Sequence, residues 1–226
     1  MRSLPLPLAL SARLAPVAVL ATAGWALSSG PLSATPTAEH KPAQQKQAAQ
    51  NTPSASDPSG AAATKTYSSS PLPCTSVTAQ TINSLVPGAK TDGKEIPSTD
   101  TKVRRTCSWN ALKGYDYRWL DVSFEIMDSD AAAQKSYTAR TTEKSGGGAV
   151  PGLGDAAYSV VNLATEDDQQ TREGVVLARV SNALVVVTYN GSNFETKKAP
   201  GTDEINKGAI KAARDAVTTL KDGQKN

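Results

Sequence analysis

Hydrophobic and polar positions alternate most clearly between Tyr117 and Ile126. An alternation of period two is typical of a strand with one buried face and one polar face. Leu120 and Phe124 belong to the apolar set, whereas Tyr117 and Trp119 fall on the otherwise polar set. On such a strand the two aromatic residues point away from the core side, about 7 Å apart.

Four other segments are also predicted to be extended. They are Val103–Trp109, Ala156–Val161, Gly174–Val180 and Leu184–Tyr189. The last two flank Ser181-Asn182-Ala183, and this spacing predicts a hairpin in which Asn182 tolerates a positive φ.

Helix signals occur at three places. Thr78 is the expected N-cap of a short helix, with Val77 and Ile82 as a hydrophobic staple. Asp128 or Ser129 is expected to cap a second helix that runs to about residue 143, before a run of three glycines. Thr202 is the expected cap of the last helix, whose apolar stripe comprises Ile205, Ala209, Ala212, Ala216 and Leu220.

These elements predict an α+β fold. An amphipathic helix and a half-polar sheet must cover each other, so we expect helices packed on a mainly antiparallel sheet. About 150 residues suit one compact domain, which we place at residues 73–221, with 222–226 as a tail.

The N-terminus has the pattern of an export signal. Arg2 and Arg13 are the only charged residues before Glu39, and an uncharged, mostly apolar run of 14 residues follows from Leu14 to Leu27. A basic start, a short apolar segment and small residues are typical of a secretory signal. We assign residues 1–27 to a signal peptide or a retained signal anchor, and the sequence leaves both alternatives open.

Residues 28–72 differ in composition from the rest of the chain. They are rich in Pro, Ala, Ser, Thr and Gln and contain few aromatic or branched apolar residues. Such a segment cannot bury enough apolar surface to offset its chain entropy, which predicts a disordered linker. The chain's single histidine, His40, lies in this linker.

The distribution of charge argues against nucleic acid as a partner. From Cys74 to the C-terminus, 12 Lys and 7 Arg balance 19 Asp and Glu, so the net charge of +3 arises before Cys74. A neutral domain lacks the basic patch that binding to phosphate backbones requires.

Cys74 and Cys107 are the only cysteines. They cannot form a metal site alone, because the domain has no histidine and no further cysteine, and their spacing excludes a redox CxxC motif. We therefore expect a structural disulfide, no metal and no cofactor. A disulfide agrees with a location outside the cytoplasm, where the chain is either secreted or anchored to the outer face of the membrane.

Catalytic motifs are not recognisable. A Ser-His-Asp triad is impossible in a domain without histidine. The glycine-rich segment 146–154 lacks the Gly-Lys-Ser/Thr ending of a phosphate loop and precedes a predicted strand. Asp155 together with Glu166-Asp167-Asp168 offers carboxylates of the kind used in glycoside hydrolysis, although acidic loop residues are usually solvated.

Three short motifs carry a resemblance. Pro73-Cys74 precedes a short predicted helix, Cys107-Ser108-Trp109 enters a predicted strand, and Pro151–Tyr158 contains Gly-Leu-Gly-Asp-Ala-Ala-Tyr. In this order they resemble a family of actinobacterial envelope proteins, mostly lipoproteins, built on a domain of unknown function. A similar architecture occurs in the extracellular sensor domains of actinobacterial Ser/Thr kinases. This chain differs in lacking a lipobox cysteine, and the resemblance implies an envelope location without implying a reaction.

These observations favour a non-catalytic, exported, envelope-associated binding or sensing domain. Its partner would be an envelope component, whether lipid, glycan or protein. Tyr117 and Trp119 are the candidate binding surface, unless another element covers them as a second core. The alternative function is an envelope hydrolase or transferase that uses carboxylates. Two accessible carboxylates beside an apolar pocket would favour the alternative, and an aromatic-lined groove would favour binding.

Overall fold

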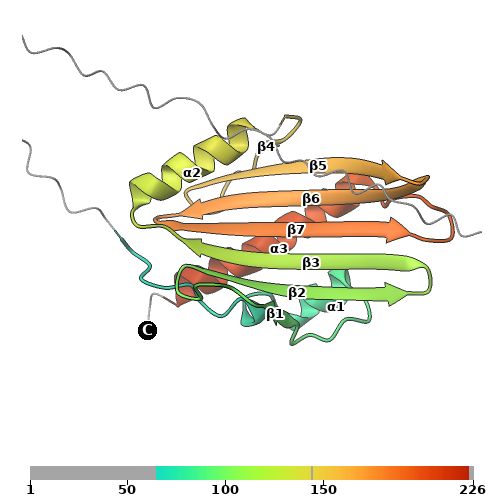
Figure 1. Ribbon diagram of the computed structural model, residues 1–226, viewed down its shortest axis with the longest axis horizontal. Coiled ribbons are helices and arrows are strands. Elements are labelled where there is room, and N and C mark those ends of the chain that lie inside the picture. Colours follow the sequence, from blue (N-terminus) through green and yellow to red (C-terminus); the bar gives the residue numbers. More distant parts are fainter. Residues whose placement is uncertain (1–64, 144, 224–226) are drawn as a thin grey trace, which may run out of the picture. The chain divides into compact units, whose positions relative to one another are not determined.

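The structure is a computed structural model that describes residues 65–143 and 145–223. The predicted signal or anchor, residues 1–27, and most of the predicted linker, residues 28–72, lie outside the described residues. The described part has the α+β fold that the sequence predicts: an antiparallel seven-stranded sheet with three α-helices and one short 3-10 helix, η1 (Figure 1).

The strand order across the sheet is β1-β2-β3-β7-β6-β5-β4, and every neighbouring pair is antiparallel. The strands are β1 (Lys94–Ile96), β2 (Arg104–Lys113), β3 (Asp116–Ile126), β4 (Gly148–Ala149), β5 (Ala156–Glu166), β6 (Gln169–Val180) and β7 (Ala183–Asn193). The predicted hairpin is confirmed and joins β6 to β7. Strand β3 pairs with the other side of β7, although β4, β5 and β6 lie between the two in the sequence.

The main core lies between one face of this sheet and α3 (Thr202–Asp222), which crosses behind the strands in Figure 1. The predicted alternation of β3 is confirmed, since Leu120, Val122 and Phe124 are fully buried against this core. The predicted apolar stripe of α3 is also buried along its whole length. Burial of these side chains stabilises the fold by about 25 cal/mol for each Å² of apolar surface removed from water.

The start of α3 corrects one expectation. Gly201, not Thr202, is the N-cap, and its carbonyl accepts the first helical hydrogen bond from Ile205 N at 3.2 Å. Thr202 is already inside the helix, so its hydroxyl is not needed as a cap. Asp203 and Glu204 do lie in the first turn, where negative charge complements the helix dipole.

The N-terminal part of the domain covers the β2 side of the core. Thr78 caps α1 (Ala79–Leu85) as predicted, accepting from Thr81 N at 3.2 Å. The staple residues Val77 and Ile82 are both buried. Before them, η1 (Pro73–Thr75) carries Cys74, which is bonded to Cys107 in β2.

Between Gly88 and Thr101, outside every strand and helix predicted from the sequence, the three-residue strand β1 pairs with β2. The turn before it depends on Gly93, which has φ +61°. A Cβ at this position would lie 2.6 Å from both Cys107 Sγ and Trp109 Nε1, so only glycine lets the chain pass this close to them.

The β6–β7 turn also differs from expectation. Ser181, not Asn182, adopts the positive φ, at +50°. Asn182 is fully buried because it bonds to two other segments: Oδ1 accepts from Tyr67 N at 2.7 Å, and Nδ2 donates to Tyr67 O and Met127 O at 2.9 and 2.8 Å. Tyr67 is itself 4% exposed, so packing on the domain begins before Pro73.

No helix in residues 65–143 or 145–223 combines the length and the apolar character needed to cross a membrane.

Candidate functional site

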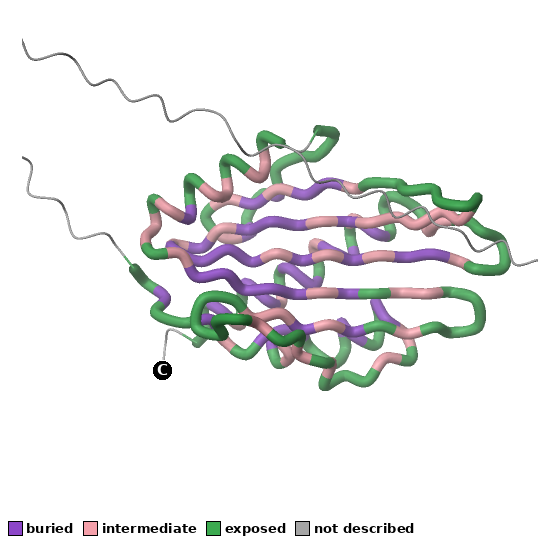
Figure 2. Tube along the Cα trace, in the orientation of Figure 1, coloured by how far each residue is buried: buried purple, intermediate pink, exposed green. Residues whose placement is uncertain are grey.

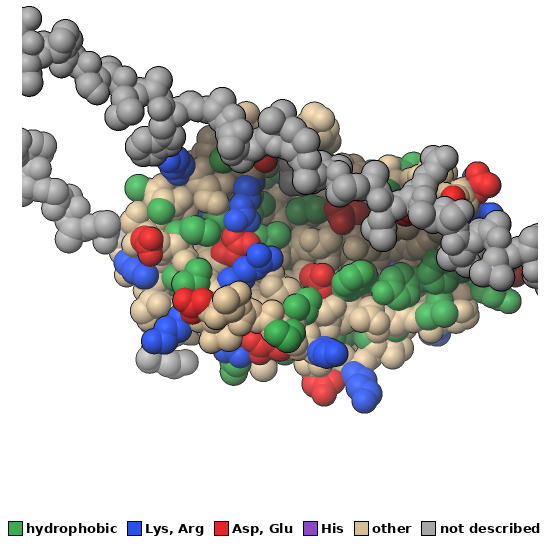
Figure 3. Space-filling model, viewed as in Figure 1, with side chains coloured by type: hydrophobic (Ala, Val, Ile, Leu, Met, Phe, Trp, Pro, Cys, Tyr) green, Lys and Arg blue, Asp and Glu red, His purple; other side chains and the backbone are tan. Residues whose placement is uncertain are grey.

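The sheet face opposite α3, called here the open face, holds the features that suit a site. The strand register places Trp119 and Asp121 of β3 on this face, beside Asn190 and Thr188 of β7. Figure 3 looks onto the open face, and its hydrophobic side chains gather over the right-hand ends of β2, β3 and β7.

One helix covers one end of the open face. In α2 (Asp130–Thr142) the only buried residue is Ala133, which packs on Leu177 and Leu184 of the sheet. Ser129 is its N-cap, one of the two predicted candidates, and accepts from Ala132 N at 3.1 Å. Figure 2 shows how little of α2 is buried compared with the strands below it. The helix is therefore held by few apolar contacts.

An ion pair adds to this attachment. Glu125 lies on the open face but is only 7% exposed, and Arg140 of α2 donates to its Oε2 at 2.5 Å. Arg104 of β2 approaches the other carboxylate oxygen at 3.8 Å. A nearly buried carboxylate needs such partners, because an unpaired buried charge is strongly unfavourable.

Two hollows meet in the middle of the open face. The first, about 270 Å³, lies between the last turn of α2 and an apolar floor that includes Val160 and Val175. The second, about 470 Å³, lies between residues 96–99, which are the end of β1 and the loop after it, and the polar side chains of β2 and β3. Val186 and Thr188 line both hollows, so we treat them as one open-face groove with two walls.

Trp119 and Tyr117 lie on the same face as this groove, further along β3 than its lining residue Asp121. Trp119 is 37% exposed, and its indole Nε1 donates to Ser108 Oγ at 2.7 Å and to Asp121 Oδ1 at 2.8 Å. Tyr117 stacks on Phe194 with ring centroids 5.9 Å apart and planes 27° from parallel. The structure therefore places both predicted residues on the face opposite the core, with Trp119 exposed.

The β1 wall of the groove is held by a bidentate ion pair. Arg105 donates to the two carboxylate oxygens of Glu95, from Nε at 2.6 Å and from Nη2 at 2.7 Å. These hydrogen bonds lower the pKa of Glu95 below its usual value, against the opposing effect of partial burial. The pair links the short edge strand to the rest of the sheet.

We expect this pair to make stability depend on pH. Because the pKa of Glu95 is lower in the folded state, its contribution is complete above the ordinary carboxyl pKa and is lost as the pH falls below it. Glu95 is partly exposed, so the effect is small, about 0.5–1 kcal/mol. In urea unfolding, Glu95→Gln should reduce the loss of stability between pH 7 and pH 3 by that amount. In the Arg105→Met background, Glu95→Gln should leave the pH dependence of stability unchanged. An equal effect of Glu95→Gln in both backgrounds would show that the ion pair does not cause this pH dependence.

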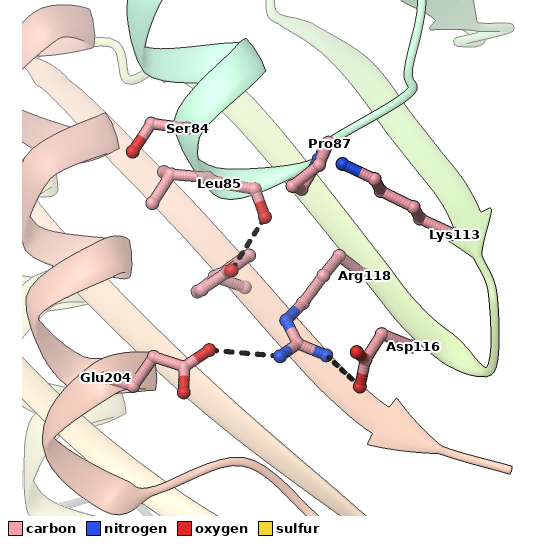
Figure 4. A pocket seen from close by; sticks show the side chains of 8 residues that line it. Ser84, Leu85, Pro87, Lys113, Asp116, Arg118 and Glu204 are labelled. Carbon is pink, nitrogen blue, oxygen red and sulfur yellow. Dashed lines mark hydrogen bonds and ion pairs between the residues drawn. The ribbon is translucent and has the colours of Figure 1, made fainter. Parts of the chain in front are cut away.

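A third hollow, of about 370 Å³, lies on the opposite face near the start of α3 (Figure 4). There Arg118 lies between two carboxylates, 3.0 Å from Glu204 and 3.9 Å from Asp116. Tyr189 donates to Leu85 O at 2.7 Å, and burial raises the pKa of its hydroxyl. These groups satisfy one another and join β3, β7, α1 and α3, which indicates a structural role.

The carboxylates proposed from sequence are far apart. Asp155 lies just before β5, where it pairs with Arg179 at 3.3 Å and accepts from Ser181 N at 2.6 Å. Asp167 and Asp168 form the turn at the opposite end of the strand, with φ of +48° and +65°. An 11-residue strand separates them by about 36 Å. They therefore cannot act together on one bond.

The disulfide expected from the sequence joins Cys74 and Cys107, with Cα atoms 5.1 Å apart. Such bonds persist in oxidising compartments outside the reducing cytoplasm. The bond lies on the core side of the sheet, so it supports the domain rather than the groove. Within the described residues, no three His, Cys, Asp or Glu side chains form a group suited to hold a metal ion.

Comparisons with known proteins identify no family for this chain. No family model and no curated protein matches the chain. A crystal structure of a protein from Bacteroides thetaiotaomicron VPI-5482 aligns with 53% of this chain at 8% identity, with a TM-score of 0.33. The aligned region spans 47% of that protein. At this level the likeness carries no argument about fold or function.

Sequence reasoning identified the aromatic pair but missed most of the groove. The floor residues Val186 and Thr188 were visible only as members of an apolar run. The role of Arg140 had no sequence signal, because its partner Glu125 is 15 residues away on another element. The register of β3 against β7 places Asp121 beside the floor residue Thr188, and Trp119 two residues further along β3, beside Asn190.

Proposed function

We propose that this domain is an extracytoplasmic binding or sensing module that takes its ligand in the open-face groove. The observation that carries the proposal is the groove itself, which has an apolar floor beneath α2 and lies beside Trp119, an exposed aromatic side chain on the same face. Concave sites with an apolar lining and a few polar groups are typical of ligand binding. The disulfide supports export, and the ligand would be a component of the cell envelope.

The carboxylates of the groove support binding over hydrolysis. Of the carboxylates that line the groove, Asp121 lies in one hollow and accepts from the indole of Trp119, and Glu143 lies in the other. Glu125, beside the groove, is engaged by Arg140. Asp121 and Glu125 are four positions apart on one strand, so their Cα atoms are about 13 Å apart. Paired carboxylates in glycoside hydrolases lie roughly 5–9.5 Å apart.

Blocking the floor of the groove tests the proposal. The full chain would be purified from the cells that export it, and bound molecules would be identified by native mass spectrometry. Thr188→Arg places a long charged side chain where the two hollows meet. Thr218→Arg is the matched control, because Thr218 is exposed on α3, away from the open face.

We expect a bound molecule on the wild-type chain and on Thr218→Arg, and its loss from Thr188→Arg. Melting curves check that both variants keep the fold, and Thr188→Lys replaces the arginine variant if the latter does not fold. Equal occupancy of the blocked and control variants, or no bound molecule on any of them, would contradict the proposal.

A further inference from the structure

One row of side chains crosses the open face next to the groove. Cross-strand pairing places Asn110, Trp119, Asn190, Glu173 and Asn162 opposite one another in turn, on β2, β3, β7, β6 and β5. Cross-strand partners point to the same face, and five strands span about 19 Å. We call these five residues the Trp119 row. It consists of an aromatic ring among three amides and one carboxylate.

The indole of Trp119 is held in one orientation. Its only polar atom, Nε1, is already used by Ser108 and Asp121. What remains for a partner is the flat, apolar ring, on a side chain that is 37% exposed. A fixed aromatic plane suits a ligand with a flat apolar face of its own.

The neighbouring side chains of the row suit a ligand that carries hydroxyl groups. Amides can donate and accept at the same time, and a carboxylate accepts, so both can bond to pairs of hydroxyls. Asn190 Oδ1 has no hydrogen-bond partner among the described residues, although it is buried.

The charge of the row excludes strongly anionic ligands. None of its five residues is basic, and Glu173 adds a negative charge. Phosphate-rich partners bind mainly to Lys and Arg. The chemistry that fits is therefore neutral, rich in hydroxyl groups, and flat and apolar on one side. A pyranose sugar has all of these properties.

A second aromatic platform lies one step further along the strand. Tyr117 is two residues from Trp119, about 7 Å away, and is stacked on Phe194. Leu112 lies opposite Tyr117 on β2 and is 58% exposed. Two platforms along one strand suit a chain of linked sugars better than a single sugar.

We propose that the Trp119 row binds a glycan strand, with one pyranose ring stacked on Trp119 and its hydroxyls bonded to the flanking amides. This inference rests on the proposed binding function and names the ligand class for the aromatic side chains next to that site. It leaves the apolar hollow beneath α2 free for any substituent that the glycan carries.

The test is calorimetric titration of the full chain with two soluble probes, the β-1,4-linked tetramers of N-acetylglucosamine and of glucose. At least one should bind saturably. Trp119→Leu keeps apolar bulk but removes the aromatic face, and should weaken binding by about tenfold or more. Trp119→Phe keeps an aromatic face and should retain most of the affinity. Tyr115→Ala is the matched control, because Tyr115 is an exposed aromatic residue outside the row.

Two results would overturn the glycan inference: neither tetramer binds, or Trp119→Leu binds as tightly as Tyr115→Ala. If the wild-type chain then still carries a non-sugar molecule that Thr188→Arg lacks, the binding function stands and only the ligand class is wrong. If Thr188→Arg also carries the same bound molecules as the wild-type chain, both proposals fail.

Discussion

Replacing Trp109 with alanine is expected to lower the free energy of unfolding by about 3–5 kcal/mol. Trp109 is 1% exposed and belongs to the main core cluster with Cys107 and Leu120. Its indole also donates to Thr91 O at 3.1 Å. The substitution leaves a cavity and an unpaired carbonyl, and the close packing at Gly93 gives the surroundings little room to collapse.

Trp119→Ala is the matched control for this prediction. Trp109 and Trp119 lie on neighbouring strands, but on opposite faces of the sheet. Removing Trp119 should cost about 1 kcal/mol or less, because its side chain is exposed and its hydrogen-bond partners can turn to water. Chemical denaturation of both variants measures the difference. A loss near 3–5 kcal/mol for Trp119→Ala would mean that the open face is a second core, and the binding proposals would then have to be dropped.

The sequence predicts only part of the difference in burial between Trp109 and Trp119. Alternation along β3 correctly placed Trp119 opposite Leu120, because side chains alternate strictly on a strand. Alternation alone does not say whether a polar face is covered. At the α2 end of the same face, Ser123 and Glu125 are buried, whereas Trp119 is exposed. This difference depends on where α2 lies, which is a matter of tertiary packing.

The position of α2 had no clear sequence signal. A helix that packs firmly on a sheet shows an apolar stripe, as α3 does with its small and branched residues. In α2 only Ala133 is fully buried, Tyr137 packs on the same cluster while partly buried, and a polar contact joins Arg140 to Glu125. The groove beneath this helix therefore could not be predicted, although its apolar floor was recognised as strand.

The two errors in local detail arise in different ways. The sequence favours Thr202 as a cap and Asn182 as a turn residue, because their side chains suit those positions. In the structure the backbone of Gly201 begins the helix, and the side chain of Asn182 is used to hold Tyr67. For Asn182 these long-range bonds override the local preference, and only the folded chain shows them.

Removing the disulfide is expected to have an effect nearly as large as that of Trp109→Ala. Cys74 and Cys107 are 33 residues apart in the sequence. Closing a loop of this length lowers the entropy of the unfolded chain, which stabilises the fold by roughly 3–4 kcal/mol. The bond also fixes η1, and the chain leading into α1, to the centre of β2.

The double substitution Cys74→Ala with Cys107→Ala should therefore lower the free energy of unfolding by that amount, as measured in urea. The wild-type chain unfolded with a reductant should approach the same value, which separates loss of the bond from loss of the two sulfur atoms. Because Cys107 is fully buried, the alanine variant should be the less stable of the two by the cost of a small cavity. Two titratable thiols in the native, unreduced chain, or equal stability with and without the bond, would show that the disulfide does not support the fold.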